Sequence, residues 1–171
     1  MLILFSIGSR RGKSATLITA LTQFKNYYDD NVDLKDIFKM DKNLSYGDMG
    51  LRDFCELMNP KVKKMQEMEN ESYNGELPEI VCLPFKANCA LVNNEIEWVE
   101  VEKLEGRVSA VLIVNYPPGI PTIMPGEKFN KNMTELIIAL AYFENEFPGY
   151  EYEVHGLISK NDKFYVPCLK Q

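Results

Sequence analysis

The sequence has little of what metal sites and disulfide frameworks require. Its 171 residues include one histidine and four cysteines, and no two cysteines have Cys-x-x-Cys spacing. Because a structural zinc site needs about four such ligands at characteristic spacings, we expect no metal site. Scattered cysteines in a chain of this length indicate reduced thiols in a cytoplasmic protein. They are Cys55, Cys82, Cys89 and Cys168, and none has a basic partner in the sequence, so each is interpreted as a small core side chain.

Long apolar runs and an excess of positive charge are also missing. The apolar run at residues 1–8 lacks a basic flank and a cleavage site, so it is not a signal peptide, and no stretch approaches the ~20 apolar residues that span a bilayer. With 19 Lys+Arg against 25 Asp+Glu the formal charge is −6, which argues against a nucleic acid partner. The 46% hydrophobic and 26% charged residues are typical of a globular protein and exclude disordered and collagen-like classes.

The first part of the chain predicts a buried strand followed by a helix. Residues 2–7 form a short apolar run that ends at Gly8. One face of the following helix carries Leu17, Leu21, Phe24 and Tyr28. A face of this kind is expected to pack against another part of the protein. Because a domain seldom begins inside its own core, we expect the sequence to be a piece of a longer protein.

The middle of the chain predicts a polar connection and a second helix. Residues 29–50 are polar, with a short turn expected at residues 34–40. The next helix has an apolar face made of Leu51, Phe54, Cys55 and Met58. Pro60 is expected to break this helix or to start another one. Asn74 and Gly75 signal a turn, and we place a domain boundary within residues 43–76.

The second half is richer in strands, which predicts the fold class α+β, with a mixed sheet and packed helices. Strands are expected at residues 79–84, 95–101 and 108–114, the second with a bulge. Residues 108–114 are apolar on both faces, so this strand is expected to be central and covered on both sides.

A helix and a hairpin are expected to complete the fold. Asn132 and Glu135 resemble a capping box at the start of a helix that ends at Pro148 and Gly149. Its inward face is expected to consist of Met133, Leu136, Ile137, Leu140 and either Phe143 or Phe147. Residues 150–158 and 164–169 predict a terminal hairpin with a turn at 160–162.

Residues 8–14 (GSRRGKS) lie between a strand and a helix, where a phosphate-binding P-loop would lie. Three residues separate Gly8 from Gly12, whereas a P-loop has four, and no aspartate follows a second apolar strand to hold magnesium. We interpret the segment as a basic turn whose position at a helix N-terminus suits an anion. A nucleotide-binding protein remains the lesser alternative.

Two further features are interpreted as structural. His155 lies next to Gly156 in a strand and has no nucleophile or second metal ligand nearby in the sequence. An acidic run is interpreted as the solvated face of a strand, with a metal site as the alternative. This run consists of Glu95, Glu97, Glu100, Glu102 and Glu105.

The sharpest local signal is a loop at residues 115–127, in which four prolines and two glycines follow the apolar strand. Proline fixes φ and Pro-Gly favours a type II turn, so the loop is expected to be rigid. We favour a stiff loop that crosses the core; the alternative is a wall near a ligand or a subunit contact. The candidate residues are Tyr116, Pro117, Pro118, Gly119, Pro121, Gly126 and Glu127.

At this loop the sequence resembles one family. The run RVSAVLIVNYPPGIPTIMPGE at residues 107–127 is similar to the C-terminal region of the bacterial pyridoxal-phosphate-dependent ornithine/lysine/arginine decarboxylases. Residues 4–8 (LFSIG) with 20–25 (ALTQFK), and 147–151 (FPGYE) with 154–156 (VHG), extend the resemblance in one order over nearly the whole chain. The features at residues 119–121, 147–149 and 167–170 favour an arginine-type member.

The resemblance implies a parent enzyme that removes the α-carboxylate of arginine, lysine or ornithine as CO₂, using pyridoxal phosphate. It implies that residues 1–45 are the tail of an aminotransferase-like small domain, 46–69 a helical connection and 70–171 the C-terminal domain. The cofactor-binding lysine of the family lies upstream of the region that matches. We therefore expect no catalytic, cofactor-binding or metal residue here, no bound cofactor and no activity of the chain alone.

Two functional hypotheses follow. In the first, the chain is the C-terminal portion of such a decarboxylase and contributes to packing and homo-oligomer assembly with the rest of the enzyme. In the second, it is a stand-alone assembly or regulatory module with the same fold. The first predicts a large exposed apolar patch where other domains would dock. The net charge adds a further hypothesis, that protonation of acidic runs at 67–76 and 95–105 favours assembly.

Overall fold

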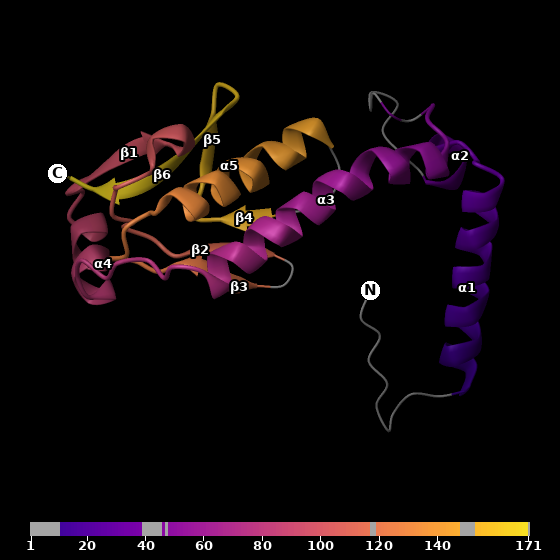
Figure 1. Cartoon of the computed structure of the whole chain (residues 1–171), viewed down its shortest axis with the longest axis horizontal. Coiled ribbons are helices and arrows are strands. Elements are labelled where there is room, and N and C mark those ends of the chain that lie inside the picture. Colours follow the sequence, from indigo (N-terminus) through magenta and orange to yellow (C-terminus); the bar gives the residue numbers. More distant parts are fainter. Residues whose placement is uncertain (1–10, 39–45, 47, 117–118, 148–152, 171) are drawn as a thin grey trace. The chain divides into compact units, whose positions relative to one another are not determined.

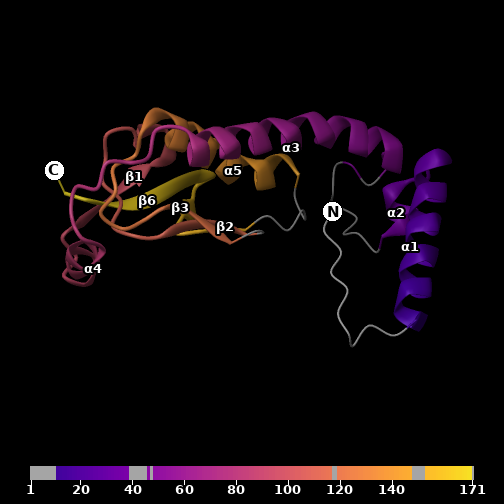
Figure 2. The ribbon, with the colours of Figure 1, turned by 60° about the horizontal axis from the view of Figure 1, so that its bottom comes forward.

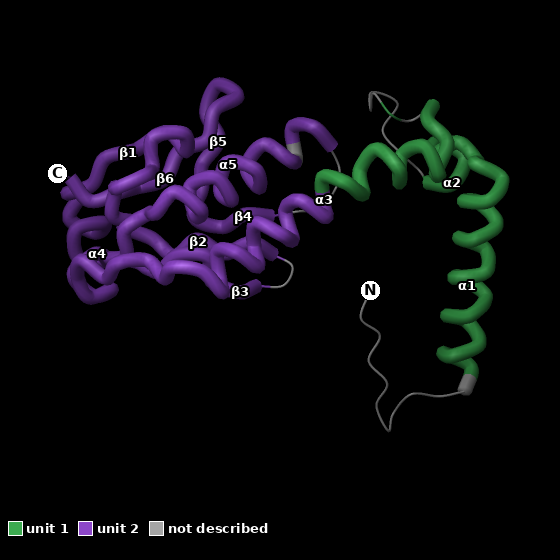
Figure 3. The backbone as a smooth tube through the Cα atoms, viewed as in Figure 1, with its two compact units in different colours: residues 1–61 green, residues 62–171 purple. Residues whose placement is uncertain are grey.

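The computed structural model describes residues 11–38, 46, 48–116, 119–147 and 153–170, apart from the side chains of Arg11 and Glu144. The chain divides into two compact units, Met1–Lys61 and Val62–Gln171, coloured separately in Figure 3. Helix α3 (Leu51–Asn74) carries the division between them. Each unit is described by itself below.

The first unit has a small core around short helix α2 (Leu34–Ile37), with Leu34, Tyr46 and Leu51 buried. Asn31 connects the preceding turn to α3: its Oδ1 accepts hydrogen bonds from the backbone N–H groups of Arg52 (2.9 Å) and Asp53 (3.3 Å). The first N–H groups of a helix have no partner within the helix, so this remote side chain supplies their acceptor. Asn31 has a φ of 51°, a conformation that asparagine tolerates better than most residues.

Helix α1 (Arg11–Asp29) confirms the first predicted helix. Its apolar face is only partly covered, because Leu21 and Phe24 remain 41% and 46% exposed. The predicted strand at residues 2–7 lies outside the described residues. The short turn expected at residues 34–40 corresponds to α2.

The prediction that Pro60 breaks or starts a helix was wrong, since α3 continues through it for 24 residues. Proline removes one backbone donor and disfavours a helix interior by ~3 kcal/mol. The residues around it, such as Leu57, Met58 and Lys61, are good helix formers, and the helix persists until Gly75. The expected turn at Asn74 and Gly75 coincides with the end of α3.

The second unit contains two three-stranded antiparallel sheets (Figure 1). In one, β6 (Lys163–Leu169) lies between β1 (Ile96–Glu100) and β5 (Ile158–Lys160). In the other, β2 (Ile113–Tyr116) lies between β3 (Ile120–Ile123) and β4 (Glu153–His155). The α+β class is confirmed, although all pairings of the described strands are antiparallel and the sheets are not mixed.

A row of single backbone bridges crosses the unit beside these sheets. Ile80 bridges Glu127, Val108 bridges Lys128 and Ser109 bridges Cys168, all antiparallel. Residues 107–110 therefore lie between residues 126–129 and β6, and their backbone groups bond to both: Ser109 N–H donates to Glu127 O, and Ala110 N–H to Pro167 O, both at 2.9 Å.

The predicted strands at residues 79–84 and 108–114 were accordingly wrong as regular strands. Residues 79–82 make one bridge, and helix α4 (Pro84–Val92) begins directly after them. In the second segment, the Ser109 hydroxyl donates to Val111 O at 2.7 Å, which turns the chain before β2 begins at Ile113. A local side-chain bond of this kind competes with a regular ladder. The central position expected for the segment is nevertheless observed at residues 107–110.

The strand expected at residues 95–101 is β1, but it has no bulge. Its pairing with β6 is continuous from Ile96–Leu169 to Glu100–Tyr165. The alternation of apolar and polar residues changes phase near Val99, which suggested a bulge. The chain instead leaves the strand after Glu100 and forms a 3₁₀ turn, η1 (Val101–Lys103), in which Val101 is fully buried.

The terminal hairpin is confirmed in β5 and β6, which are joined at Asn161 and Asp162. The preceding residues do not continue it: β4 pairs with β2 in the other sheet. Gly156, with a φ of 96°, lies between β4 and β5 and lets consecutive strands enter different sheets.

Helix α5 (Lys131–Glu146) packs on the strands, as Figures 1 and 2 show. The inward residues predicted for it are all buried, namely Met133, Leu136, Ile137, Leu140, Phe143 and Phe147. The capping residue was predicted wrongly: Asn130, and not Asn132, accepts from Met133 N–H at 2.9 Å. Asn132 is already inside the helix, where its side chain has no free N–H two or three residues ahead to cap. Pro148 and Gly149 lie outside the described residues.

Candidate functional site

The loop singled out in the sequence is a β-hairpin followed by a tight turn. Strands β2 and β3 pair across the hairpin, whose residues Pro117 and Pro118 lie outside the described residues. Gly119 has a φ of 81° and its N–H donates to Asn115 O at 2.9 Å. Tyr116 and Ile120 are 58% and 49% exposed, so the described flanks of the turn present apolar surface.

Pro121 lies on β3, opposite Val114 of β2. Because β3 is an edge strand of its sheet, one side of its backbone has no neighbouring strand in the described structure. Proline, which cannot donate a hydrogen bond, is tolerated at such a position. The residue therefore fits the edge of the sheet, next to an irregularity in the register between Ile113 and Val114 of β2.

A buried polar cluster fixes the hairpin to α3. Asn115 is fully buried; its Oδ1 accepts from the Thr122 hydroxyl at 3.1 Å, and its Nδ2 donates to Glu69 Oε1 at 2.5 Å. The Tyr73 hydroxyl donates to Ile120 O at 3.4 Å, and burial raises the pKa of this phenol. Because buried polar groups are costly without partners, the cluster specifies one register of α3 on the hairpin.

Gly126 and Glu127 form the second turn of the loop. The Gly126 carbonyl accepts from Val81 N–H (2.9 Å) and Cys82 N–H (3.2 Å). Its φ is 89°, and an added Cβ would lie 2.2 Å from Cys82 O. The Glu127 carboxylate accepts from Met124 N–H at 2.7 Å and closes the turn. These contacts are structural, and they join residues 79–82 to the centre of the unit.

Sequence reasoning missed a run of exposed apolar side chains directly before β1. We call residues 77–92 the apolar face. Its exposed members are Leu77 (72%), Ile80 (70%), Val81 (50%), Leu83 (65%), Phe85 (75%) and Val92 (75%). Residues 79–84 were interpreted as a strand, and α4 was not predicted, although Pro84 at its first turn is a helix-start signal.

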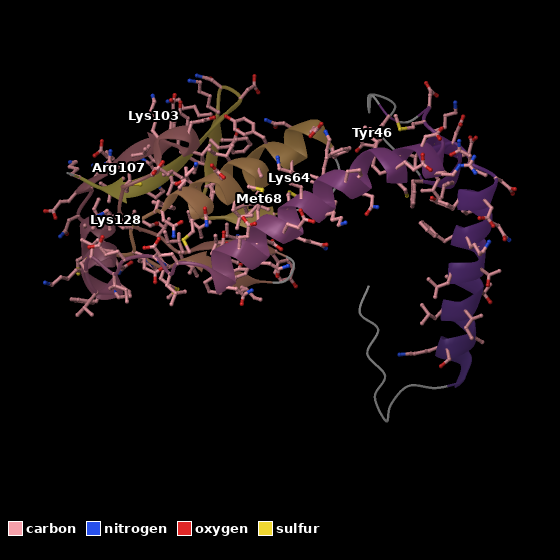
Figure 4. The ribbon with its side chains drawn as sticks, in the orientation of Figure 1. Tyr46, Lys64, Met68, Lys103, Arg107 and Lys128 are labelled. Carbon is pink, nitrogen blue, oxygen red and sulfur yellow. The ribbon has the colours of Figure 1, made fainter. Side chains whose placement is uncertain are left out.

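The acidic run is partly neutralised by basic partners. Glu100 holds ion pairs at 2.7 Å with both Lys103 and Lys163, and hydrogen bonds from Lys103 and then Lys163 lower its pKa to about 2. Glu97 pairs with Arg107, labelled in Figure 4. These ion pairs reduce the repulsion among the carboxylates of residues 95–105. The hypothesis that protonation of these carboxylates favours assembly stays a prediction. Within the described part of the chain, no three His, Cys, Asp or Glu side chains gather in a group that could hold a metal.

The remaining sequence candidates are dispersed. His155 is exposed, and its Nε2 lies 3.7 Å from Glu153 Oε2. Cys168 is buried in the core, and burial raises its pKa to about 12; Cys55, Cys82 and Cys89 are half-buried. Residues 8–10 of the basic turn lie outside the described residues. Among the helices that the structure describes, none is both long and apolar enough to cross a bilayer.

Comparison with known proteins gives a consistent result. The model of the family described as Orn/Lys/Arg decarboxylase, C-terminal domain, matches residues 65–170. Lysine decarboxylase LdcA of Pseudomonas aeruginosa is 38% identical in an alignment covering 99% of this chain and 24% of that protein. The biodegradative arginine decarboxylase of Escherichia coli K12 is 34% identical, with 99% and 23% covered.

Solved structures show the same likeness. The constitutive lysine decarboxylase of E. coli has a TM-score of 0.83 at 31% identity, covering 98% of this chain and 25% of that one. Lysine decarboxylase A from P. aeruginosa has a TM-score of 0.82 at 36% identity, covering 98% and 24%. The chain thus spans about a quarter of the length of the relatives it matches.

Proposed function

The chain belongs to the Orn/Lys/Arg decarboxylase family, and we propose that it is the C-terminal part of a pyridoxal-phosphate-dependent decarboxylase of a basic amino acid. The observation that carries the proposal is the match of residues 65–170 to the C-terminal domain of that family. Relatives named for lysine and for arginine have similar identities, 38% and 34%, so the substrate is proposed only as a basic amino acid. The arginine-type preference stays a prediction.

The proposal includes a division of the chain into three parts. Residues 1–45 would be the tail of the aminotransferase-like small domain, 46–69 the helical connection and 70–171 the C-terminal domain. Two observations support this division: the compact units separate at Lys61 and Val62, inside the proposed connection, and that connection is largely α3.

We further propose that this segment does not hold the cofactor. A lysine that forms an imine with pyridoxal phosphate is normally activated by a lowered pKa. Two of the described lysines have the opposite shift: hydrogen bonds to Asp48 and to Glu100 raise the pKa values of Lys35 and Lys163, respectively. Lys128, labelled in Figure 4, pairs with Glu79 at 2.8 Å. We therefore assign no catalytic step to residues of this chain.

The role that remains is packing and homo-oligomer assembly. Large apolar side chains are exposed in both units, for example Ile18 (64%) on α1 and Phe85 (75%) on α4. Exposed apolar patches on a folded domain mark contacts with other protein surfaces. A cytoplasmic location is part of the proposal, and it is supported by the four cysteines, all of which are free.

An activity assay and a chimera test the proposal. The isolated chain, incubated with pyridoxal phosphate and lysine, arginine or ornithine, should release no amine product. A chimera in which this chain replaces the matching segment of P. aeruginosa lysine decarboxylase should bind the cofactor and decarboxylate lysine, whereas the relative without that segment should not. Amine release by the chain alone, or a chimera no more active than the shortened relative, would contradict the proposal.

A further inference from the structure

The apolar face, residues 77–92, differs from the rest of the second unit in two ways. Its large apolar side chains are exposed, and part of its backbone has no hydrogen-bond partner on one side in the described part of the chain. Single exposed apolar residues are ordinary on protein surfaces. Here six large ones occur within sixteen residues, each at least 50% exposed. Ile80 and Val81 are adjacent in an extended segment, so their side chains point to opposite sides, and both are exposed.

The backbone of this segment has one paired and one open side. Val81 N–H donates to Gly126 O, and Lys128 N–H donates to Glu79 O, both at 2.9 Å. These two bonds flank the antiparallel bridge between Ile80 and Glu127. In that arrangement the N–H and C=O of Ile80 point away from Glu127. Within the described residues, no backbone partner faces them.

The segment is nevertheless held firmly in place. Gly126 O accepts two of its N–H groups, Lys128 pairs with Glu79, and Ala87 of α4 is fully buried. The face is therefore a fixed surface of the folded unit. A fixed apolar edge with open backbone groups is a site for pairing with another polypeptide, and natural proteins keep such edges covered.

We infer that the apolar face is the surface on which this C-terminal domain docks against the part of the full-length decarboxylase that lies outside this chain. The inference rests on the proposed function. Its occupant is chosen from length: the relatives are about four times as long as this chain, since the chain covers 24% to 25% of them. The face lies inside residues 65–170, the region that the family shares.

Hydrogen–deuterium exchange tests the inference in the chimera with P. aeruginosa lysine decarboxylase. Peptides from residues 77–92 should exchange at least about tenfold more slowly in the chimera than in the isolated chain, because docking adds protection to amides that are open without it. Phe85→Ser should remove most of that protection. The matched control is Ile158→Ser, which changes an apolar residue that is 43% exposed on β5 and should leave the protection unchanged.

Each outcome has a defined meaning. If the chimera is inactive with and without the substitutions, the proposed function fails and the inference fails with it. If the chimera is active but residues 77–92 exchange as in the isolated chain, or Phe85→Ser has no more effect than Ile158→Ser, only the inference is overturned. Sedimentation of the isolated chain adds a separate criterion: a concentration-dependent dimer that Phe85→Ser abolishes would make a second copy the occupant and would overturn the inference. Unchanged tryptophan fluorescence of Phe85→Ser shows that the variant folds.

Discussion

Replacing Gly126 by alanine tests how the loop holds residues 79–82. The new Cβ would lie 2.2 Å from the carbonyl oxygen of Cys82, so the backbone of one segment must move. Movement weakens the two hydrogen bonds that Gly126 O accepts from Val81 and Cys82, each contributing about 1 kcal/mol. The left-handed φ of 89° adds about 1–2 kcal/mol of strain for alanine.

The free energy of unfolding should therefore fall by about 2–4 kcal/mol, after the ~0.4–1 kcal/mol that alanine gains by restricting the unfolded chain. Gly106→Ala is the matched control, because its φ is 78° but an added Cβ would meet nothing within 4 Å. It should cost only the strain less the same gain, about 0–1.6 kcal/mol.

Urea unfolding followed by tryptophan fluorescence measures the difference. The protein has one tryptophan, Trp98, which lies on β1 in the second unit, so the signal reports the unit that contains both glycines. If Gly126→Ala destabilised the protein no more than Gly106→Ala, the close packing of the turn against residues 79–82 would not be contributing to stability, and the reasoning would be refuted.

Three further outcomes are expected. Glu100→Gln should lower stability at neutral pH, and this deficit should disappear as the pH falls from about 4.5 to about 2, because a carboxylate with a lowered pKa stabilises the fold only while it is ionised; urea midpoints across this range would show a constant deficit if the lysine pairs did not matter. Asn115→Ala should lower the free energy of unfolding by about 1–3 kcal/mol, since it leaves the buried Thr122 hydroxyl without its acceptor. Thr122→Val should cost less stability in the Asn115→Ala protein than in the unchanged protein. Cys168 should be the slowest cysteine to react with iodoacetamide in the native protein, because its pKa is about 12, and equal labelling of Cys89 and Cys168 by mass spectrometry would contradict this.

The sequence predicted those parts of the fold that depend on local periodicity. The stripes of α1 and α5 and the β5–β6 hairpin follow from spacing and turn residues, which act within a few positions. The failures share a different cause, since each depends on a partner far away in the chain. Residues 108–114 look like one strand, but residues 108–110 bond to residues 126–127 and 167–169, whereas Ile113 and Val114 belong to β2 and pair with β3 and β4.

The candidate loop shows the same limit. Its glycines and prolines correctly indicated tight turns, and Gly119 and Gly126 both have positive φ values. The polar cluster that anchors it joins Asn115 to Glu69, 46 positions earlier, and nothing in the spacing of the sequence signals that pair. The apolar face was misread as a strand at residues 79–84, because a short apolar run predicts a strand, whereas these residues make a single bridge and then enter α4.

The arrangement of β6 has a consequence for synthesis on the ribosome. This strand is the middle member of its sheet, and β1 pairs with it over five residues although some sixty residues separate them in the chain. While residues 96–162 emerge, β1 has no permanent neighbour, and Val99 and Val101 stay without the core that Val166 and Cys168 complete. Nascent chains are therefore expected to expose unpaired strand edges, which chaperones bind, until β6 is free to pair. A chain that stops shortly before Leu169 would be prone to aggregate.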